Sequence, residues 1–497
     1  MPGLAVPTVS NLSTLFKSVR LGALNLLGQK KDIINRLPDE TLSEIFLHAT
    51  ALLATETFPP LLDDEIMCKT PVISQNNQST PFPLSQVCRR WRAIVQHTSS
   101  MWRSIAILHP NKRHLYRTKL WLTYARNQEL DIMIDQSSDL SEEEIETTSE
   151  LLKLLAHGKR LYRWSSLDVQ LCREAAYLLS TQLDELRLAK SQALCTANIW
   201  ILEPMDENVV DTMWKALNGI TSLYELQWRA DGSRVGITPS HTFGRQLQFL
   251  KISIPVPVDH AIRNLRYCSD LKVLTLHFSG LASSSSSILP FVELKHLDTL
   301  VVRSTDPLVD FFLHCTFPSL KSLEVDQITE TEAPYVLQML RRSRCELQVF
   351  VARFPRLSSD TLIDWIKSPS LQSLETLCLA GVDVTDEVLT ALTWPPSDTC
   401  AMDSSITYLP KLEHLGLTHC GPSITSDIFI RMLGSRFWPA PQRGTVGHIK
   451  NVRAELITAI LTVSVKTSQM EQYERTIKDC ASRTEGWGER RLTIQEA

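Results

Sequence analysis

The sequence predicts an α/β protein in which a small helical module near the N-terminus precedes an irregular solenoid of repeated strand and helix units. Two observations predict the solenoid: a leucine motif that recurs at steps of 23 to 27 residues, and helix-like stretches between its copies. A third observation, a pair of short amphipathic segments between residues 34 and 106, predicts the helical module. With 497 residues, 43% of them hydrophobic, the chain is long enough to bury a large core.

The repeated motif is leucine, two variable residues, leucine, one variable residue and an apolar residue. Copies start at 183, 223, 247, 271, 297, 320, 347, 374 and 412, as LDELRL, LYELQW, LQFLKI, LKVLTL, LDTLVV, LKSLEV, LQVFVA, LETLCL and LEHLGL. From 223 to 374 the steps are 24, 24, 26, 23, 27 and 27 residues, which is the period of leucine-rich repeats. Each unit can bury its leucines only by stacking on its neighbours. We therefore expect parallel strands on the concave face and helices outside, against the alternative of a generic α/β protein with buried strands.

Helices are expected between these strands, for example at 333–343 (APYVLQMLRRS) and at 359–368 (SDTLIDWIKS), where Ser and Asp are suitable caps. We assign residues 107–437 to the solenoid and 438–497 to a C-terminal tail or cap. The tail contains a short strand or helix around 457–465. A helical stretch at 468–483 either covers the last repeat or belongs to a disordered extension.

Variable positions of the strands are the candidate substrate-binding residues, because a solenoid presents its concave face to partners. They are Arg187, Gln227, Arg229, Lys251, His277, Arg303, Glu324, Asp326 and His414, with Glu185, Glu225, Ser253, Thr275, Thr299 and Thr418 in the same positions. The charges are mixed, and the whole chain carries a net charge of only −4. This balance favours a protein partner and indicates no nucleic acid. The short clusters Arg89, Arg90, Arg92 and Arg341, Arg342, Arg344 are expected to be solvated.

Residues 34–106 form the predicted helical module, with an inserted loop at about 52–82. Pro38 suits the first turn of a helix, and the acidic residues after it suit the positive end of the helix dipole. The first apolar stripe is Leu42, Ile45, Phe46 and Ala49, and the second is Leu84, Val87, Cys88, Trp91 and Val95. Trp91 and Trp102 are either core aromatics or part of a binding motif. A module of this size leaves some apolar surface for another protein.

These residues resemble the F-box. The matching motifs are Leu37-Pro38-Asp39-Glu40, Ile45-Phe46, Val87-Cys88, Trp91-Arg92 and Trp102-Arg103. The resemblance implies docking on the Skp-type adaptor of a cullin-RING ubiquitin ligase, through Leu37, Pro38, Ile45, Phe46, Leu84, Val87, Cys88 and Trp91. The long insert, with Asp63-Asp64-Glu65 and a polar run at 75–80, is similar to that of mushroom-type fungal F-box proteins.

The resemblance implies a substrate-recognition subunit of an SCF-type ligase, bound to the adaptor and to an unidentified protein substrate as a monomer within a larger complex. The alternative is a leucine-rich-repeat scaffold or receptor with no ligase role. No catalytic residue, cofactor or metal is expected, since GxxxxGK[ST], GxGxxG, HExxH and GxSxG are absent. The pairs His109/His114 and His414/His419 are poorly spaced for metal binding.

The compartment is expected to be reducing, because the eleven cysteines are scattered and never closer than twenty residues. The sequence contains no run of eighteen apolar residues, so it predicts no membrane-spanning helix. Residues 1–33 form an amphipathic or flexible segment, in which residues 1–31 carry Lys17, Arg20, Lys30 and Lys31 but no acid. This pattern suits partner packing or, alternatively, mitochondrial targeting. We expect a cytoplasmic or nuclear protein. The serine run 283–287 is expected to be a loop.

Overall fold

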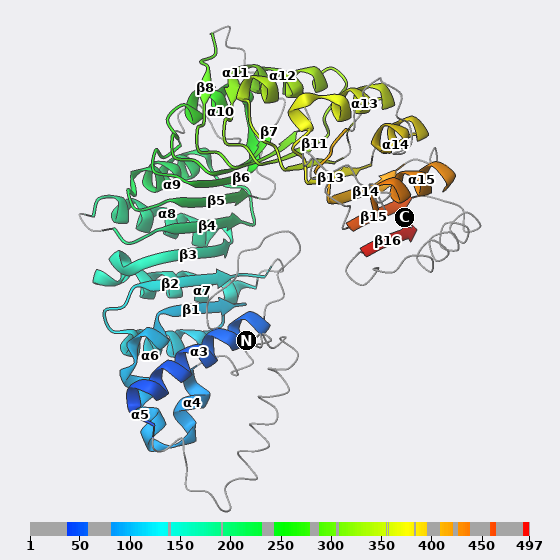
Figure 1. The fold of residues 1–497 in the computed structure, drawn as a ribbon. Helices are drawn as coiled ribbons and strands as arrows, with labels where there is room; N and C mark the ends of the chain where they lie inside the picture. The colour runs from blue at the N-terminus through cyan, green and yellow to red at the C-terminus, as the bar shows by residue number, and fades with distance from the viewer. Residues whose placement is uncertain are drawn as a thin grey trace, which may run out of the picture. The chain divides into compact units, whose positions relative to one another are not determined.

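The computed structural model describes residues 37–57, 81–137, 141–189, 192–230, 243–278, 288–304, 308–353, 355, 357–381, 384–394, 408–420, 426–437, 458–463 and 491–496. Figure 1 shows the helices and strands of the described residues. The chain divides into two compact units. Unit 1 consists of residues 1–108 and 113–131, and unit 2 consists of residues 109–112 and 132–497. The expectations for residues 1–33, for the polar part of the insert, for the serine run and for 468–483 lie outside the described residues.

Unit 1 contains most of the predicted helical module. Its elements are α3 (Asp39–Thr57), α4 (Pro81–Val87), α5 (Arg89–His97), the 3-10 helix η3 (Ser99–Trp102), β1 (Ser104–Leu108) and α6 (Lys112–Ala125). The boundary passes through β2 (Leu130–Asp135), whose Asp131 N–H donates to the Arg103 carbonyl. Helix α3 continues into the predicted insert as far as Thr57.

An aromatic cluster forms the core of unit 1. Trp102 is fully buried and packs edge-on against Phe82 and Trp121, with ring centroids 5.4 and 5.0 Å away. Its indole N–H donates to the Val95 carbonyl over 2.8 Å. Trp102 is therefore a core aromatic, and it joins α4, α5 and α6.

Unit 2 alternates strands and helices. Its strands after β2 are β3 (Trp164–Leu171), β4 (Thr196–Ile201), β5 (Glu225–Ala230), β6 (Phe249–Val256), β7 (Val273–Phe278), β8 (Val292–Glu293), β9 (Thr299–Ser304), β10 (Cys315–Thr316), β11 (Ser322–Asp326), β12 (Val349–Arg353), β13 (Thr376–Ala380), β14 (His414–Cys420), β15 (Thr458–Val463) and β16 (Arg491–Glu496). Its helices are α7 (Glu142–Ala156), η4 (Gly158–Arg163), α8 (Arg173–Arg187), α9 (Glu207–Gly219), α10 (Val258–Leu265), α11 (Val309–His314), α12 (Ala333–Ser343), α13 (Ser359–Lys367), η5 (Pro369–Leu371), α14 (Asp386–Leu392) and α15 (Ser426–Phe437).

Twelve of these strands, among the residues that the structure describes, pair in parallel in the order β3-β4-β5-β6-β7-β9-β11-β12-β13-β14-β15-β16. The pairing is in register, so equivalent side chains form rows across the sheet. One row runs through Leu226, Leu250, Leu274, Leu300, Leu323, Phe350, Leu377 and Leu415, each at most 4% exposed. This row confirms an α/β solenoid-like fold.

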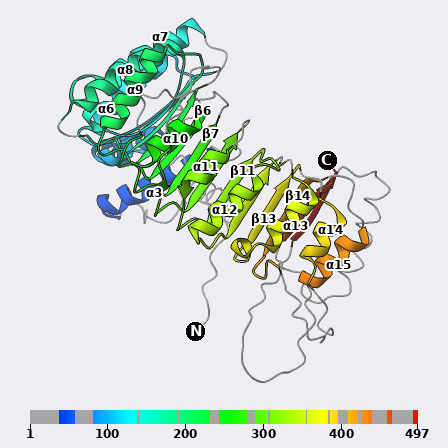
Figure 2. The ribbon, with the colours of Figure 1, turned by 90° about the horizontal axis from the view of Figure 1, so that it is seen from above.

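Helices cover the face of the sheet that carries this apolar row. Aromatic contacts join the two layers: Trp214 on α9 with Trp228 on β5 at 5.5 Å, and Phe350 on β12 with Trp365 on α13 at 5.1 Å. Neighbouring helices also contact one another: α8 packs against α9, and α13 packs against α14. Figure 2 shows that α10 to α14 follow one another across the sheet, beside successive strands. The opposite face of the sheet is named the open face below.

Side-chain hydrogen bonds tie consecutive repeats at a nearly constant sequence separation. Ser222, Ser319 and Ser373 each donate from Oγ to a carbonyl of the preceding repeat, that of Leu194, Lys295 or Leu347, over 2.6 to 2.8 Å. Gln246 donates in the same way to the Ile220 carbonyl over 2.9 Å. These bonds satisfy loop carbonyls that the strands do not pair.

Several expected elements are confirmed and others are corrected. Helices α12 and α13 lie where they were predicted, and the Ser358 Oγ caps α13 by accepting from the Thr361 N–H. The copy LDELRL is not a strand, because it lies in α8. Its leucines at i and i+3 continue a helical stripe with Leu179, so the spacing fits a helix as well as a strand. In the tail, the short strand or helix expected around 457–465 is a strand, β15, and together with β16 it extends the parallel sheet beyond residue 437.

A buried arginine fastens the end of the helical layer. Arg436 on α15 is 1% exposed and donates to the carbonyls of Leu392, Tyr408 and Leu409 over 2.6, 2.9 and 3.1 Å. Its guanidinium also lies 5.1 Å from the Trp394 ring centroid. Burial lowers the pKa of Arg436 to about 9. This side chain therefore joins three segments far apart in the sequence.

Replacing Arg436 with methionine is expected to lower the free energy of unfolding by about 3 kcal/mol, because buried carbonyls lose their donor. The matched control is Arg431→Met, since Arg431 is exposed on the same helix. Its effect is expected to stay within about 0.5 kcal/mol. Urea unfolding followed by circular dichroism measures both. Equal effects of the two substitutions would contradict the role assigned to Arg436.

Candidate docking surfaces

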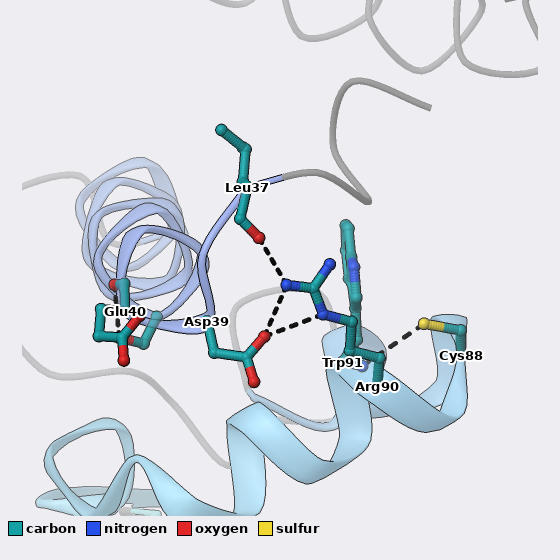
Figure 3. A network of polar contacts seen from close by, with 7 residues as sticks. Leu37, Asp39, Glu40, Cys88, Arg90 and Trp91 are labelled. Carbon is teal, nitrogen blue, oxygen red and sulfur yellow. Dashed lines mark hydrogen bonds and ion pairs between the residues drawn. The ribbon is translucent and has the colours of Figure 1, made fainter. Parts of the chain in front are cut away.

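Two contacts hold α3 against α5 in unit 1. The rings of Phe46 and Trp91 lie 4.6 Å apart, and Phe46 is only 2% exposed. Arg90 donates to Asp39 Oδ1 from Nη2 and Nε over 2.6 and 2.9 Å, and from Nη2 to the Leu37 carbonyl over 2.5 Å (Figure 3). The start of α3 is therefore fixed to α5 by an aromatic contact and a charged clamp.

Cys88 separates α4 from α5. The second apolar stripe was expected to lie on one continuous helix, but the backbone at Cys88 is extended, with φ −156° and ψ 171°. The Cys88 sulfur accepts a hydrogen bond from the Trp91 N–H over 3.4 Å and so acts as the N-cap of α5. This break turns Val87 and Cys88 outward, whereas Val95 further along α5 is buried.

The residues expected to bind the adaptor fall into two groups. Phe46 is part of the core. The others leave apolar surface uncovered: Ile45 is 46% and Val87 60% exposed, Pro38 and Cys88 are exposed, and Leu37, Leu84 and Trp91 are half-buried. We name this second group the helical patch. Its residues lie just before and on α3, on α4, and at the start of α5.

The arginine clusters were expected to be solvated. Arg92 is exposed as expected, whereas Arg90 and Arg342 are half-buried, which corrects the expectation for these two. Arg90 clamps α3, and Arg92 Nε donates to the Ser85 carbonyl over 3.0 Å. Arg342 donates to the carbonyls of Phe312 and Cys315, each over 2.6 Å. Sequence reasoning missed these roles because their acceptors are mostly backbone carbonyls, which leave no residue pattern.

The open face of unit 2 carries most of the expected substrate-binding residues. Gln227, Arg229, Lys251, His277, Arg303, Glu324, Asp326 and His414 all lie on strands β5 to β14 at positions that alternate with the buried row. Arg187 and its neighbour Glu185 do not, because both belong to helix α8. Their placement on the strand face is therefore wrong.

Ion pairs cross neighbouring strands on one part of this face. Arg303 Nε lies 3.6 Å from Asp326 Oδ2, and Arg353 Nη2 lies 3.2 Å from Glu324 Oε1. Burial raises the pKa of Asp326, and the charges of Arg303, Arg353 and His277 oppose that rise. The sequence did not predict Arg353 as a residue of this face, because its repeat is a weak copy of the leucine motif.

A second polar group lies on β3 and β4, which lack the leucine motif, and on the neighbouring strand β5. Asn198 on β4 donates to Asp168 on β3 over 3.0 Å, and Arg229 on β5 stacks on Trp200 with its Cζ 3.7 Å from the ring centroid. Burial, and then the negative charge of Asp135, raise the pKa of Asp168 to about 6, and the bond from Asn198 opposes them. Strands β3 and β4 lack the leucine spacing, although their alternation of apolar and polar residues is a usable signal.

Within the described residues, no group of three or more His, Cys, Asp or Glu side chains is placed to hold a metal ion. The cysteines there are free thiols, and burial raises the pKa of Cys268 and Cys315 to about 12. None of the helices in the described ranges is long and apolar enough to cross a membrane.

No protein-family model matches the sequence, and a comparison with curated proteins found no match. Among solved structures, the chain is similar to a protein from Bacteroides fragilis, with a TM-score of 0.32 and 10% identity over 71% of this chain and 84% of that one. It is also similar to a chain of the yeast Rad7 and Elc1 complex, with a TM-score of 0.34 and 10% identity over 98% of both chains. Likeness of this degree assigns neither a family nor a partner.

Substituting Asp168 with asparagine is expected to stabilise the fold at neutral pH. In the folded state the pKa of Asp168 is about 6, above the ordinary value of 3.8. Protonated Asp168 therefore stabilises the folded state fully below pH 3.8, and this stabilisation is lost as the pH rises through 6. Asparagine keeps an acceptor for Asn198 and cannot ionise. We expect a gain on the order of 2 kcal/mol at pH 7.5 and little difference at pH 4. Urea unfolding at both pH values measures it, and a variant less stable at pH 7.5 would contradict the assignment.

Proposed function

We propose that this chain is the substrate-recognition subunit of an SCF-type cullin-RING ubiquitin ligase. Unit 1 is proposed to dock on a Skp-type adaptor as an F-box, and the open face of unit 2 is proposed to bind a protein substrate. The observation that supports docking most strongly is the helical patch, in which the residues of the F-box-like motifs are folded together yet leave Ile45 and Val87 uncovered.

The division between buried and exposed motif residues suits a docking module. Phe46 packs on Trp91, and Arg90 clamps the start of α3, so the segments bearing the patch are held before any partner arrives. A surface organised in advance loses less conformational entropy on binding. Exposed apolar side chains on such a surface are typical of protein interfaces.

The open face suits the second role, because it offers charged and amide side chains on a rigid parallel sheet. A substrate bound there is brought to a ligase whose catalytic groups lie on other subunits. The gain in rate then comes from a high effective concentration of substrate lysines. We propose no catalytic residue and no cofactor for this chain, and we propose that it acts in the cytoplasm or nucleus.

Co-purification with a Skp-type adaptor tests the docking proposal. Ile45→Asp and Val87→Asp are each expected to weaken binding at least tenfold, because a charge replaces an exposed apolar contact of about 2 kcal/mol. Both sites are already solvent-exposed, so circular dichroism should show an unchanged fold.

Tyr116→Asp is the matched control, since Tyr116 is 72% exposed on α6 and lies outside the helical patch. It is expected to leave adaptor binding unchanged. A wild-type chain that fails to bind the adaptor would rule out the ligase role and leave a leucine-rich-repeat scaffold or receptor. Equal loss in all three variants would show that the helical patch is not the docking surface.

A further inference from the structure

One register row of the open face separates positive from negative charge. Asp168 on β3 pairs in register with Asn198 on β4, Asn198 with Gln227 on β5, and Gln227 with Lys251 on β6. The row therefore runs acid, amide, amide, ammonium across four adjacent strands. All four side chains are half-buried on the same face of one sheet.

Two further charges lie beside this row, one of them at its negative end. At the β3 end, Asp135 lies close enough to Asp168 for its negative charge to raise the pKa of that carboxyl. Arg229 on β5 adds a second positive charge to this face, and its guanidinium lies over the ring of Trp200 on β4, between the two ends of the row. A ligand on this row therefore meets a negative end and a positive end.

The two amides between the ends suit a peptide backbone. Asn and Gln side chains each carry a donor and an acceptor, as a peptide group does. Gln227 Nε2 makes only a long contact of 3.4 Å with Glu225, while Asn198 uses one N–H on Asp168. Each amide oxygen and the remaining N–H groups can meet peptide groups of a segment lying across the strands.

We propose that the row from Asp168 to Lys251 binds an extended segment of a protein partner that carries one basic and one acidic side chain about four residues apart. The basic side chain lies against Asp168 and the acidic side chain against Lys251. This inference rests on the proposed function, because it names the class of substrate that the open face takes.

The spacing follows from the geometry of the sheet. Neighbouring strands lie about 4.8 Å apart, so the three steps from β3 to β6 span about 14 Å. An extended chain advances about 3.4 Å per residue, so about four residues cover this distance. An even separation also places both side chains on the same side of the extended segment, facing the sheet.

Charge complementarity favours this occupant over a polyanion. A nucleic acid carries a regular series of negative charges, and the carboxylates of Asp168 and Asp135 would repel it. A segment with one charge of each sign matches both ends of the row. Like charges placed at the wrong end cost affinity, so the row also selects against other sequences.

A peptide array binding the full-length chain tests the proposal. Each peptide carries two charged residues in a Ser, Thr and Val background, as Lys/Glu, Lys/Lys or Glu/Glu, at every separation from one to eight residues. The measurement is made at a pH well above 6, where Asp168 is ionised. We expect the strongest binding for Lys/Glu peptides with a separation of four.

Two substitutions connect the preference to the row. Asp168→Asn is expected to reduce binding of the preferred peptide about tenfold and to remove the need for its lysine. Lys251→Glu is expected to shift the preference to Lys/Lys peptides at the same separation. The matched controls are Asp360→Asn on α13 and Lys215→Glu on α9, both at exposed helix positions, and they should change nothing.

Each outcome bears on the proposal. No binding to any peptide, no preference in separation, or a preference that Lys251→Glu leaves unchanged would overturn it. Selective binding of anionic oligonucleotides would also overturn it. Adaptor binding is measured separately with the Ile45 and Val87 variants, so a charge-selective open face can stand without the ligase role, and the ligase role can stand without this specificity.

Discussion

The in-register row of apolar side chains from Leu226 to Leu415 is the constraint on which unit 2 depends. Each strand is too short to bury its side chains alone, so it must stack on its neighbours with equivalent positions aligned. Within the described ranges, the helices lie on the face that carries the apolar row, and the residues that alternate with this row lie on the other face. The open face is therefore a consequence of how the core is built, and its side chains keep fixed positions because the strands beneath them are paired.

Unit 1 differs from unit 2, because the few helices described in it enclose only a small interior. The aromatic cluster around Trp102 supplies the core, and Arg90 adds a charged clamp where α3 begins. The break at Cys88 then prevents α4 and α5 from forming one helix with a single buried stripe. Apolar side chains that a larger domain would bury remain at the surface, and we propose that a partner covers them.

The solenoid could be predicted from the sequence because leucines recur at the period of its repeats. Helices α12 and α13 could be predicted because they lie between copies of this leucine motif. The copy at 183 was misassigned because leucines three residues apart suit a helix equally well. Strands β3 and β4 were missed because they lack the motif, and with them Asp168 and Trp200. Arg90 binds Asp39 and the Leu37 carbonyl, and Arg436 binds three carbonyls. Only the folded chain brings these acceptors to the arginines, so no sequence pattern could reveal the two roles.

We propose that the helical patch and the open face bind two different partners. Hydrogen–deuterium exchange of the full chain, with and without a Skp-type adaptor, tests it most directly. We expect slower exchange at residues 37–47 and 84–95 and no change in strands β3 to β14. Unchanged exchange in unit 1, or protection confined to the strands of unit 2, would contradict it.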